Sequence, residues 1–248
     1  MTKVTKTRVD ALLVTRGLAE SRARAQALVL AGLVFSGERR LDKPGQTVPE
    51  DIEIAVRGRD HPYVSRGGLK LVRGLDHFGF DPTGVVGLDV GASTGGFTDV
   101  LLRRGAEKVY AVDVGHGQLA WSLRQDPRVV VMEKQNARHL TDAQIPERVG
   151  AIVCDASFIG LATVLATPLT FAGPGAFLVG LIKPQFEVGP DKVAKGGIVR
   201  DEAARQEACD RIVAWMGAQP GWTVLGVTES PITGADGNVE FLIGARHA

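Results

Sequence analysis

Cysteine is scarce in this sequence, and its scarcity limits the compartment and the kinds of site to expect. Only two cysteines occur among 248 residues, Cys154 inside an apolar run and Cys209 in a helical pattern. Two such residues supply neither a disulfide framework nor a metal cluster, so we expect a reducing, cytoplasmic setting and no metal site. The first twenty residues also lack an apolar core of signal-peptide length, because charged side chains interrupt them.

A strong net charge is also missing, since the whole chain carries only +1. The charge is unevenly distributed: residues 1–70 hold 13 Lys or Arg against 8 Asp or Glu, and the other residues hold 16 against 20. Such a basic N-terminal part fits either a nucleic-acid surface or an ordinary solvated one.

One stretch without charged residues, 156–182, is long enough to span a bilayer. Pro168, Gly173, Pro174 and Gly175 interrupt it, and helix breakers in a lone spanning segment would leave backbone groups unpaired in lipid. We therefore read it as a buried helix, a turn and a buried strand, and expect no stable membrane association.

The N-terminal part shows two short helical patterns followed by a small sheet, over about residues 6 to 57. The second helix begins at the N-cap candidate Ser21 and stops at Gly32. Arg22 and Arg24 in its first turn oppose the helix dipole, which either a phosphate ligand or chance would explain. We expect three segments: a small domain at 1–58, a linker at 59–64 and a larger domain at 65–248.

Strands and helices alternate in the larger domain, which predicts a Rossmann-like, mostly parallel, doubly wound sheet. A closing hairpin without a helix indicates an antiparallel last strand, as in methyltransferases. The expected strands are 85–90, 108–112, 129–132, 151–153, 176–182, 222–227 and 239–243, and the expected helices are 97–103, 118–124, 161–167 and 202–216.

A glycine-rich loop after the first of these strands marks a cofactor site. The loop is not the G-x-G-x-x-G of a pyrophosphate binder, and Asp89 before it suits an ammonium or sulfonium group. Asp113 ends the second strand and could bind ribose hydroxyls, or could serve as a helix cap. Asn136 could recognise adenine, or simply form a loop. The expected cofactor-binding residues are Asp89, Gly91, Ala92, Ser93, Thr94, Gly95, Gly96, Phe97, Asp113, Asn136, Ala137 and Asp155.

Four charged residues are candidates for the chemistry: Lys70, Asp155, Lys183 and Glu240. Asp155 and Lys183 directly end apolar strands, although a single charged residue is more often a surface group. Two lysines beside carboxylates could deprotonate a weakly acidic hydroxyl and stabilise the resulting oxyanion.

Three separated motifs resemble the hemolysin A-like TlyA family. They are YVSRGGLK at 63–70, DVGASTGGFTD at 89–99, and KPQFE at 183–187 with Lys195-Gly196-Gly197. The resemblance implies an FtsJ-like catalytic domain behind an S4-like RNA-binding domain, although Ser36 stands where that module more often has Asn. It also implies an S-adenosylmethionine-dependent 2′-O-ribose methyltransferase acting on cytidines of 16S or 23S rRNA.

The same resemblance implies a Lys-Asp-Lys-Glu catalytic tetrad at Lys70, Asp155, Lys183 and Glu240. Lys183 would accept the proton, Asp155 would orient it, and the other two would position the group. We expect rRNA or ribosomal subunits as partners, bound through Arg8, Arg16, Arg22, Arg24 and Arg66. The alternatives are a membrane-active hemolysin and a catalytically silent RNA-binding protein; the modified nucleotide and the oligomeric state stay open.

Overall fold

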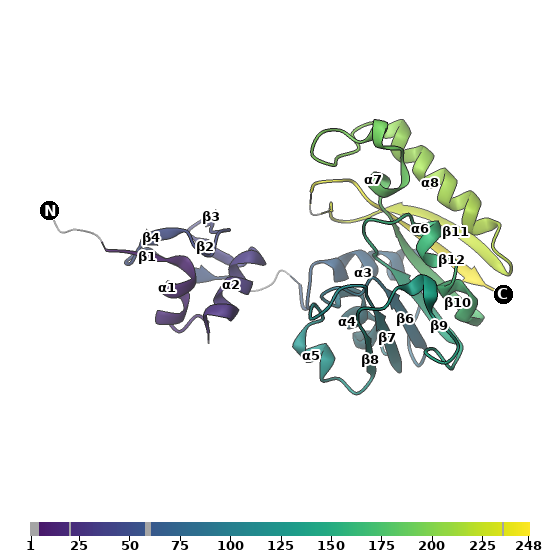
Figure 1. The fold of residues 1–248 in the computed structure, drawn as a ribbon, viewed down its shortest axis with the longest axis horizontal. Coiled ribbons are helices and arrows are strands. Elements are labelled where there is room, and N and C mark those ends of the chain that lie inside the picture. The colour runs from purple at the N-terminus through teal and green to yellow at the C-terminus, as the bar shows by residue number, and fades with distance from the viewer. Residues whose placement is uncertain (1–4, 20, 58–60, 235) are drawn as a thin grey trace. The chain divides into compact units, whose positions relative to one another are not determined.

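The computed structural model describes residues 5–19, 21–57, 61–234 and 236–248, which form two compact units, Met1–Pro62 and Tyr63–Ala248 (Figure 1). Residues 59 and 60 of the predicted linker lie outside the described residues. Val64, also predicted as linker, belongs to the second unit, where its N–H donates to Asp99 at 2.8 Å.

The N-terminal unit packs two helices against short strands. Ser21 caps the second helix as predicted, its hydroxyl accepting the N–H of Arg24 at 3.2 Å. The strands form a two-stranded sheet, β1-β4, and a three-stranded sheet, β3-β2-β5. The elements are β1 (Lys6–Arg8), α1 (Val9–Thr15), α2 (Arg22–Leu30), β2 (Val34–Ser36), β3 (Arg39–Arg40), β4 (Thr47–Pro49) and β5 (Ala55–Val56).

The alternating apolar residues from Val48 to Val56 predict short strands, and the structure has two there, β4 and β5. The chain turns after β4, where the N–H of Ile52 donates to the carbonyl of Pro49. Ile54 is nevertheless buried in the core of the unit with Leu12, Leu13 and Val29. The apolar spacing therefore reports burial correctly although the backbone between the strands is irregular.

The second unit is built on a seven-stranded sheet in the order β11-β12-β10-β9-β6-β7-β8. The final strand, β12, runs antiparallel to both β10 and β11, and the pairs among β10, β9, β6, β7 and β8 are parallel. This confirms the predicted fold class. The strands are β6 (Val86–Val90), β7 (Lys108–Val112), β8 (Val129–Met132), β9 (Val149–Cys154), β10 (Ala172–Ile182), β11 (Trp222–Glu229) and β12 (Phe241–His247).

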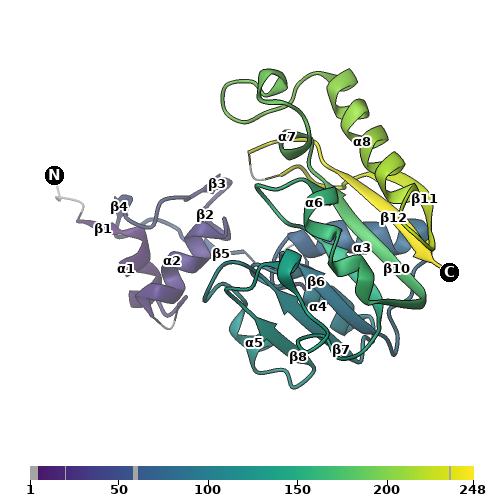
Figure 2. The same ribbon diagram turned by 45° about the vertical axis from the view of Figure 1, so that its right-hand side comes forward.

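Both faces of this sheet are buried, because successive side chains of each strand point to opposite sides. In β9, Ile152 and Cys154 join one apolar cluster, whereas Ala151 and Val153 join the other. Helices α3 and α4 pack on one face and α6 and α8 on the other (Figure 2). The helices are α3 (Gly67–Phe78), α4 (Gly96–Arg103), α5 (Trp121–Arg124), α6 (Leu161–Leu165), α7 (Pro184–Glu187) and α8 (Glu202–Gly217).

Helix α3 was not predicted, because three glycines weaken its helical pattern. The structure gives a reason for two of them. A Cβ on Gly74 would lie 2.6 Å from Val179 Cγ1, and one on Gly68 would lie 2.8 Å from the ring of Tyr63. Gly74 thus allows the helix to lie close to strand β10, and Gly68 allows it to lie close to Tyr63; this placement carries Lys70 into the site.

Several predicted boundaries differ from the structure. The 222–227 strand extends to Glu229, and the last strand begins at Phe241, so that Glu240 lies just before it. Strand β10 begins at Ala172 and passes through Gly173-Pro174-Gly175, where its register shifts. Within the described residues, no helix combines the length and apolar character that crossing a membrane requires.

Candidate active site

The functional side chains gather at the carboxyl ends of the parallel strands. Asp155 follows β9, Lys183 follows β10, and the glycine-rich loop follows β6. Because β9 lies between β6 and β10, these three points are adjacent at one edge of the sheet. Ligands bind at this edge in open parallel sheets.

Lys183 is held by three oxygen atoms. Its Nζ lies 2.7 Å from Asp155 Oδ1, and donates to the Asp155 carbonyl at 3.1 Å and to Ser157 Oγ at 2.8 Å. The lysine is buried, and three partners leave its ammonium group little freedom. Ser157 was not predicted, although it lies only two residues after Asp155.

Lys70 reaches the same cluster from α3. Its Nζ lies 2.6 Å from Glu240 Oε2 and 3.9 Å from Asp155 Oδ2, and both Lys70 and Glu240 are buried. The four predicted catalytic residues therefore form one continuous group with two positive and two negative charges. Burial strengthens each interaction and makes removal of any one member costly.

The cluster opens into a cavity of about 480 Å³, here called the catalytic cavity. Arg66, Gln185 and Phe186 line it together with the four charged residues. Phe158 also lines it; this side chain is 90% exposed, has a φ of +66°, and lies 5.2 Å from the Phe186 ring, centroid to centroid. A large exposed aromatic ring beside a buried charged cluster is a ready surface for stacking a flat ligand.

A second cavity of about 520 Å³, here called the cofactor cavity, adjoins the first. The two share Gly91, Ser93, Asp155, Ser157 and Phe158. A ligand in the cofactor cavity can therefore extend to the charged cluster. The predicted residues Asp113, Asn136 and Ala137 line the cofactor cavity, with Val112, Val114, Ile159 and Val164 as apolar neighbours.

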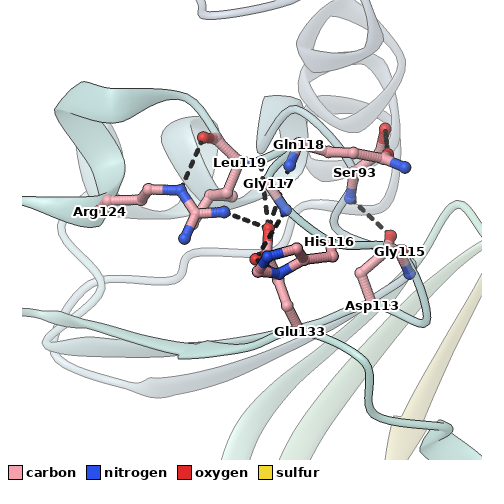
Figure 3. Close-up of polar contacts among 9 residues, drawn as sticks. All are labelled: Ser93, Asp113, Gly115, His116, Gly117, Gln118, Leu119, Arg124 and Glu133. Atoms are coloured by element: carbon pink, nitrogen blue, oxygen red, sulfur yellow. Dashed lines mark hydrogen bonds and ion pairs between the residues drawn. The ribbon is translucent and has the colours of Figure 1, made fainter.

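The glycine-rich loop forms the boundary between these cavities. Gly91 has a φ of +82°, and a Cβ there would lie 2.8 Å from the Cα of Ala156, so a larger residue would not fit. Asp113 ties the loop to the next strand end, because its Oδ2 accepts the N–H of Ser93 at 2.8 Å (Figure 3). The predicted loop residues that line one or both cavities are Gly91, Ala92, Ser93, Thr94, Gly96 and Phe97.

Two predicted cofactor residues, Asp89 and Gly95, line neither cavity. Asp89 is fully buried in β6 and accepts a 2.6 Å hydrogen bond from the Thr98 hydroxyl, a partner that the sequence did not indicate. Burial raises the pKa of Asp89 to about 7, although the Thr98 bond opposes the rise. In this structure Asp89 thus lies behind the glycine-rich loop and not on the wall of either cavity.

The predicted RNA-binding arginines fall into different environments. Arg8 and Arg22 both pair with the buried Asp10, at 2.8 and 3.2 Å, yet their guanidinium groups stay partly exposed. Arg16 instead donates to the backbone carbonyls of Ile52 and Glu50. Arg24 and Arg66 are exposed, and neither forms a side-chain hydrogen bond or ion pair within the described part of the chain.

The strand order, the glycine-rich loop and the adjoining cavities define a methyltransferase of the Rossmann-like class. The comparisons agree with this class. The model of the FtsJ-like methyltransferase family matches residues 63–247, and that of the S4 domain matches residues 7–54. The chain therefore belongs to the FtsJ-like methyltransferases, and within them to the TlyA family.

Two relatives and one solved structure each match almost the whole chain. The 16S/23S rRNA (cytidine-2′-O)-methyltransferase TlyA of Mycobacterium tuberculosis is 48% identical over 97% of this chain and 90% of its own length. Hemolysin A of Brachyspira hyodysenteriae is 39% identical over 95% and 98%. A solved Streptococcus thermophilus structure, described as a "putative hemolysin", shares 39% identity over 99% and 90%, with a TM-score of 0.75.

These matches confirm the predicted family, the predicted enzyme class and the S4 domain. They also confirm the predicted cofactor, S-adenosylmethionine, which is the methyl donor of this class. The individual site residues stay predictions, supported by the geometry given above.

Proposed function

We propose that this protein transfers a methyl group from S-adenosylmethionine to a ribose 2′-hydroxyl of ribosomal RNA, on cytidines of the 16S or 23S molecule. The observation that carries the proposal is the Lys-Asp-Lys-Glu group at the junction of two adjoining cavities, in which Asp155 is partly exposed and the other three residues are buried. One cavity takes the methyl donor and the other takes the target nucleotide. The substrate named for the Mycobacterium tuberculosis relative supports this choice of RNA.

The cofactor cavity suits the donor's adenosine part. Asp113 carries a carboxylate for the ribose hydroxyls, because each oxygen accepts one backbone N–H and still has a free lone pair. Asn136 and Ala137 lie on the wall expected to hold adenine, and the loop from Gly91 lets the backbone approach the methionine part. When bound, S-adenosylmethionine supplies an electrophilic methyl group on a sulfonium.

The chain's own contribution is to orient and deprotonate the attacking hydroxyl. Lys183 accepts the hydroxyl proton on the lone pair of its neutral Nζ, so the proton of its resting ammonium form first leaves to solvent through the catalytic cavity. Asp155 holds Lys183 in place through their 2.7 Å contact and balances the charge that forms when the proton is taken up. Lys70 and Glu240 position this pair and balance its charge. Because the four groups interact closely, their protonation is a property of the set.

Delivery of the RNA involves both units. We propose that residues 1–58 form the RNA-binding domain, that 59–64 link it to the catalytic domain at 65–248, and that the protein acts in the cytoplasm, where ribosomes are made. Arg8, Arg22 and Arg24 offer exposed guanidinium groups for phosphates. Arg16 is the weakest candidate among the arginines predicted to bind RNA, because its guanidinium already donates to two backbone carbonyls.

The target nucleotide must leave any helical stack to reach the buried cluster. Phe158 offers a ring on which an extruded base could stack, and Arg66 on the same cavity wall could bind a neighbouring phosphate.

The decisive experiment measures transfer of labelled methyl from S-adenosylmethionine to purified small and large ribosomal subunits. The unchanged chain should label RNA in at least one subunit, and Lys183→Ala should not, while both proteins bind RNA equally. Label at the 2′-oxygen of a cytidine would identify the product. Absence of label on both subunits and on free rRNA would favour the silent RNA-binding protein.

The hemolysin alternative needs a separate measurement, because one relative bears that name. Flotation with liposomes tests it directly. Recovery of the protein in the lipid fraction, together with normal methylation, would show a second activity beside the proposed one.

A further inference from the structure

We infer that Glu133 is a positioning residue for cofactor binding, because its carboxylate holds the turn that places Asp113 and Gln118 on the wall of the cofactor cavity. This inference rests on the proposed function, in which that cavity takes the methyl donor. Glu133 directly follows β8, at the same edge of the sheet as Asp113. Its position in the sequence did not single it out as a site residue, unlike that of Asn136.

The carboxylate of Glu133 accepts hydrogen bonds from three successive backbone N–H groups (Figure 3). Gly117 donates to Oε2 at 2.9 Å, and Gln118 and Leu119 donate to Oε1 at 3.1 and 3.5 Å. Successive N–H groups that converge in this way form a binding site for an anion. Here a side chain of the same unit supplies that anion.

Two cationic or polar side chains complete this arrangement. The guanidinium of Arg124 contacts Glu133 Oε1, and also donates to the carbonyl of Leu119 at 3.1 Å. The Nδ1 atom of His116 lies 3.2 Å from Oε2. The Glu133 side chain is only 11% exposed, and the backbone N–H of Gly117 is the largest influence that lowers its pKa to about 2. The carboxylate therefore stays charged at neutral pH.

The backbone pairing of β7 and β8 continues beyond the ends of both strands, and the Glu133 carboxylate adds to it. The N–H groups of Gln135 and Lys134 donate to the carbonyls of Asp113 and Gly115, both at 2.9 Å. Glu133 then holds the following residues, 117–119, through its side chain. The predicted helix at 118–124 begins only at Trp121, and the N–H groups of 118 and 119 before it bind Glu133.

The turn held in this way forms part of the cofactor cavity. Gln118 lines that cavity, and its Oε1 accepts a 3.2 Å hydrogen bond from the hydroxyl of Ser93. Asp113 binds the N–H of Ser93, so both ends of the turn contact the glycine-rich loop. Glu133 and Arg124 line neither cavity, and therefore act on the cofactor only through the turn.

Glu133→Gln in the full chain tests the inference, because it keeps the size of the side chain and removes its charge. We expect the Kd for S-adenosylmethionine, measured by calorimetry, to rise about tenfold, because the variant loses the charge-assisted hydrogen bonds that hold one wall of the cofactor cavity. The KM for rRNA, and kcat at saturating cofactor, should stay within about twofold of the unchanged chain.

Glu147→Gln is the matched control. Glu147 also anchors β7, accepting bonds from Lys108 Nζ at 2.7 Å and Tyr110 Oη at 2.6 Å, but it lines neither cavity. Its variant should leave the cofactor Kd unchanged. Equal Kd values for both variants would overturn the inference, and so would a loss of kcat and rRNA affinity in Glu133→Gln as large as its loss of cofactor affinity.

Arg124→Gln decides the question if Glu133→Gln does not fold. It removes the contact of Arg124 with the carboxylate and its bond to the Leu119 carbonyl, and leaves the three N–H bonds, so we expect the cofactor Kd to rise about threefold with rRNA affinity unchanged. An unchanged Kd overturns the inference. The proposed function is judged by methyl transfer with the unchanged chain, and this inference by Kd ratios between variants, so the two can fail separately.

Discussion

In each unit of this protein, one aspartate lies beside two basic side chains. In the second, catalytic unit the basic side chains are buried, whereas in the N-terminal unit the aspartate is buried and its basic partners are partly exposed. In the catalytic unit, Asp155 lies 2.7 Å from Lys183 and 3.9 Å from Lys70. In the N-terminal unit, Asp10 lies 2.8 Å from Arg8 and 3.2 Å from Arg22. The two lysine side chains are 9% exposed or less, whereas the two arginine side chains are 48% and 57% exposed.

The difference matches two different tasks. A lysine can gain and lose its proton, and burial beside a carboxylate facing a cavity places that proton where chemistry can use it. An arginine keeps its charge and offers a planar set of donors to phosphate. Asp10 is fully buried beneath its arginines and fixes their positions, while their charged ends remain available at the surface.

The largest effect should come from Asp155→Asn. The amide removes the counter-charge of Lys183, although the contacts of Lys183 with the Asp155 carbonyl and Ser157 Oγ remain. We therefore expect kcat to fall by roughly 100- to 1000-fold, in the range for a positioned proton-transfer group. Single-turnover methylation at saturating cofactor and rRNA measures this. Asp126→Asn, which changes an aspartate paired with Arg128 outside both cavities, should leave the rate unchanged.

Asp10→Asn tests the corresponding aspartate of the N-terminal unit. The N-terminal unit should lose about 3 kcal/mol of unfolding free energy, because a buried carboxylate with two basic partners is removed. RNA affinity should fall with it, and the cofactor Kd should not change. Chemical denaturation and RNA titration test this; Asp42→Asn, an exposed partner of Arg40, is the control.

The same aspartate predicts a pH dependence. Its hydrogen bond to Arg8, above all, holds the pKa of Asp10 well below its usual value. Because the folded state binds fewer protons than the unfolded state, the stabilisation is present above about pH 4 and disappears as the pH falls toward the folded-state pKa. In the Asp10→Asn variant, the N-terminal unit should not lose this part of its folding stability as the pH falls. An equal acid sensitivity in both proteins would contradict the assignment.

Asp89 provides a contrast to Asp10, because it is a buried aspartate whose hydrogen-bond partner, Thr98, is neutral. Its pKa rises to about 7, so the folded state binds more protons than the unfolded state between about pH 4 and pH 7. Unfolding free energy therefore falls as the pH rises through that window. Asp89→Asn should remove this slope and raise Tm at pH 8 by a few °C, which calorimetry at pH 5 and pH 8 would reveal.

The smallest effect should come from Arg24→Ala, which removes one exposed arginine without disturbing Asp10. We expect rRNA affinity to fall about threefold and the slope of log K against log salt to decrease by about one, as for loss of one phosphate contact. Arg104→Ala, which changes a partner of Asp76, should alter neither value. An unchanged salt slope in Arg24→Ala would remove that residue from the RNA surface.

Much of this molecule could be predicted from local pattern. The alternation of apolar strands and helices gave the sheet, and Asp155 and Lys183 drew attention because each ends an apolar strand. Glu133 also follows an apolar strand, and treating that position in the same way would have found it. Helix α3 was missed because local propensity disfavours glycine, whereas close packing against Val179 requires it.

The sequence by itself determined the family and the succession of strands and helices along the chain, and the family resemblance implied the set of four charged residues, because strand ends and motifs are properties of neighbouring residues. Only the tertiary structure decided which charges pair. Lys70 and Glu240 pair although they lie 170 positions apart in the sequence. Asp10 pairs with Arg8 and Arg22 and not with Arg24. Such pairings depend on burial and distance across the fold, and both are set by packing between elements that are far apart in the chain.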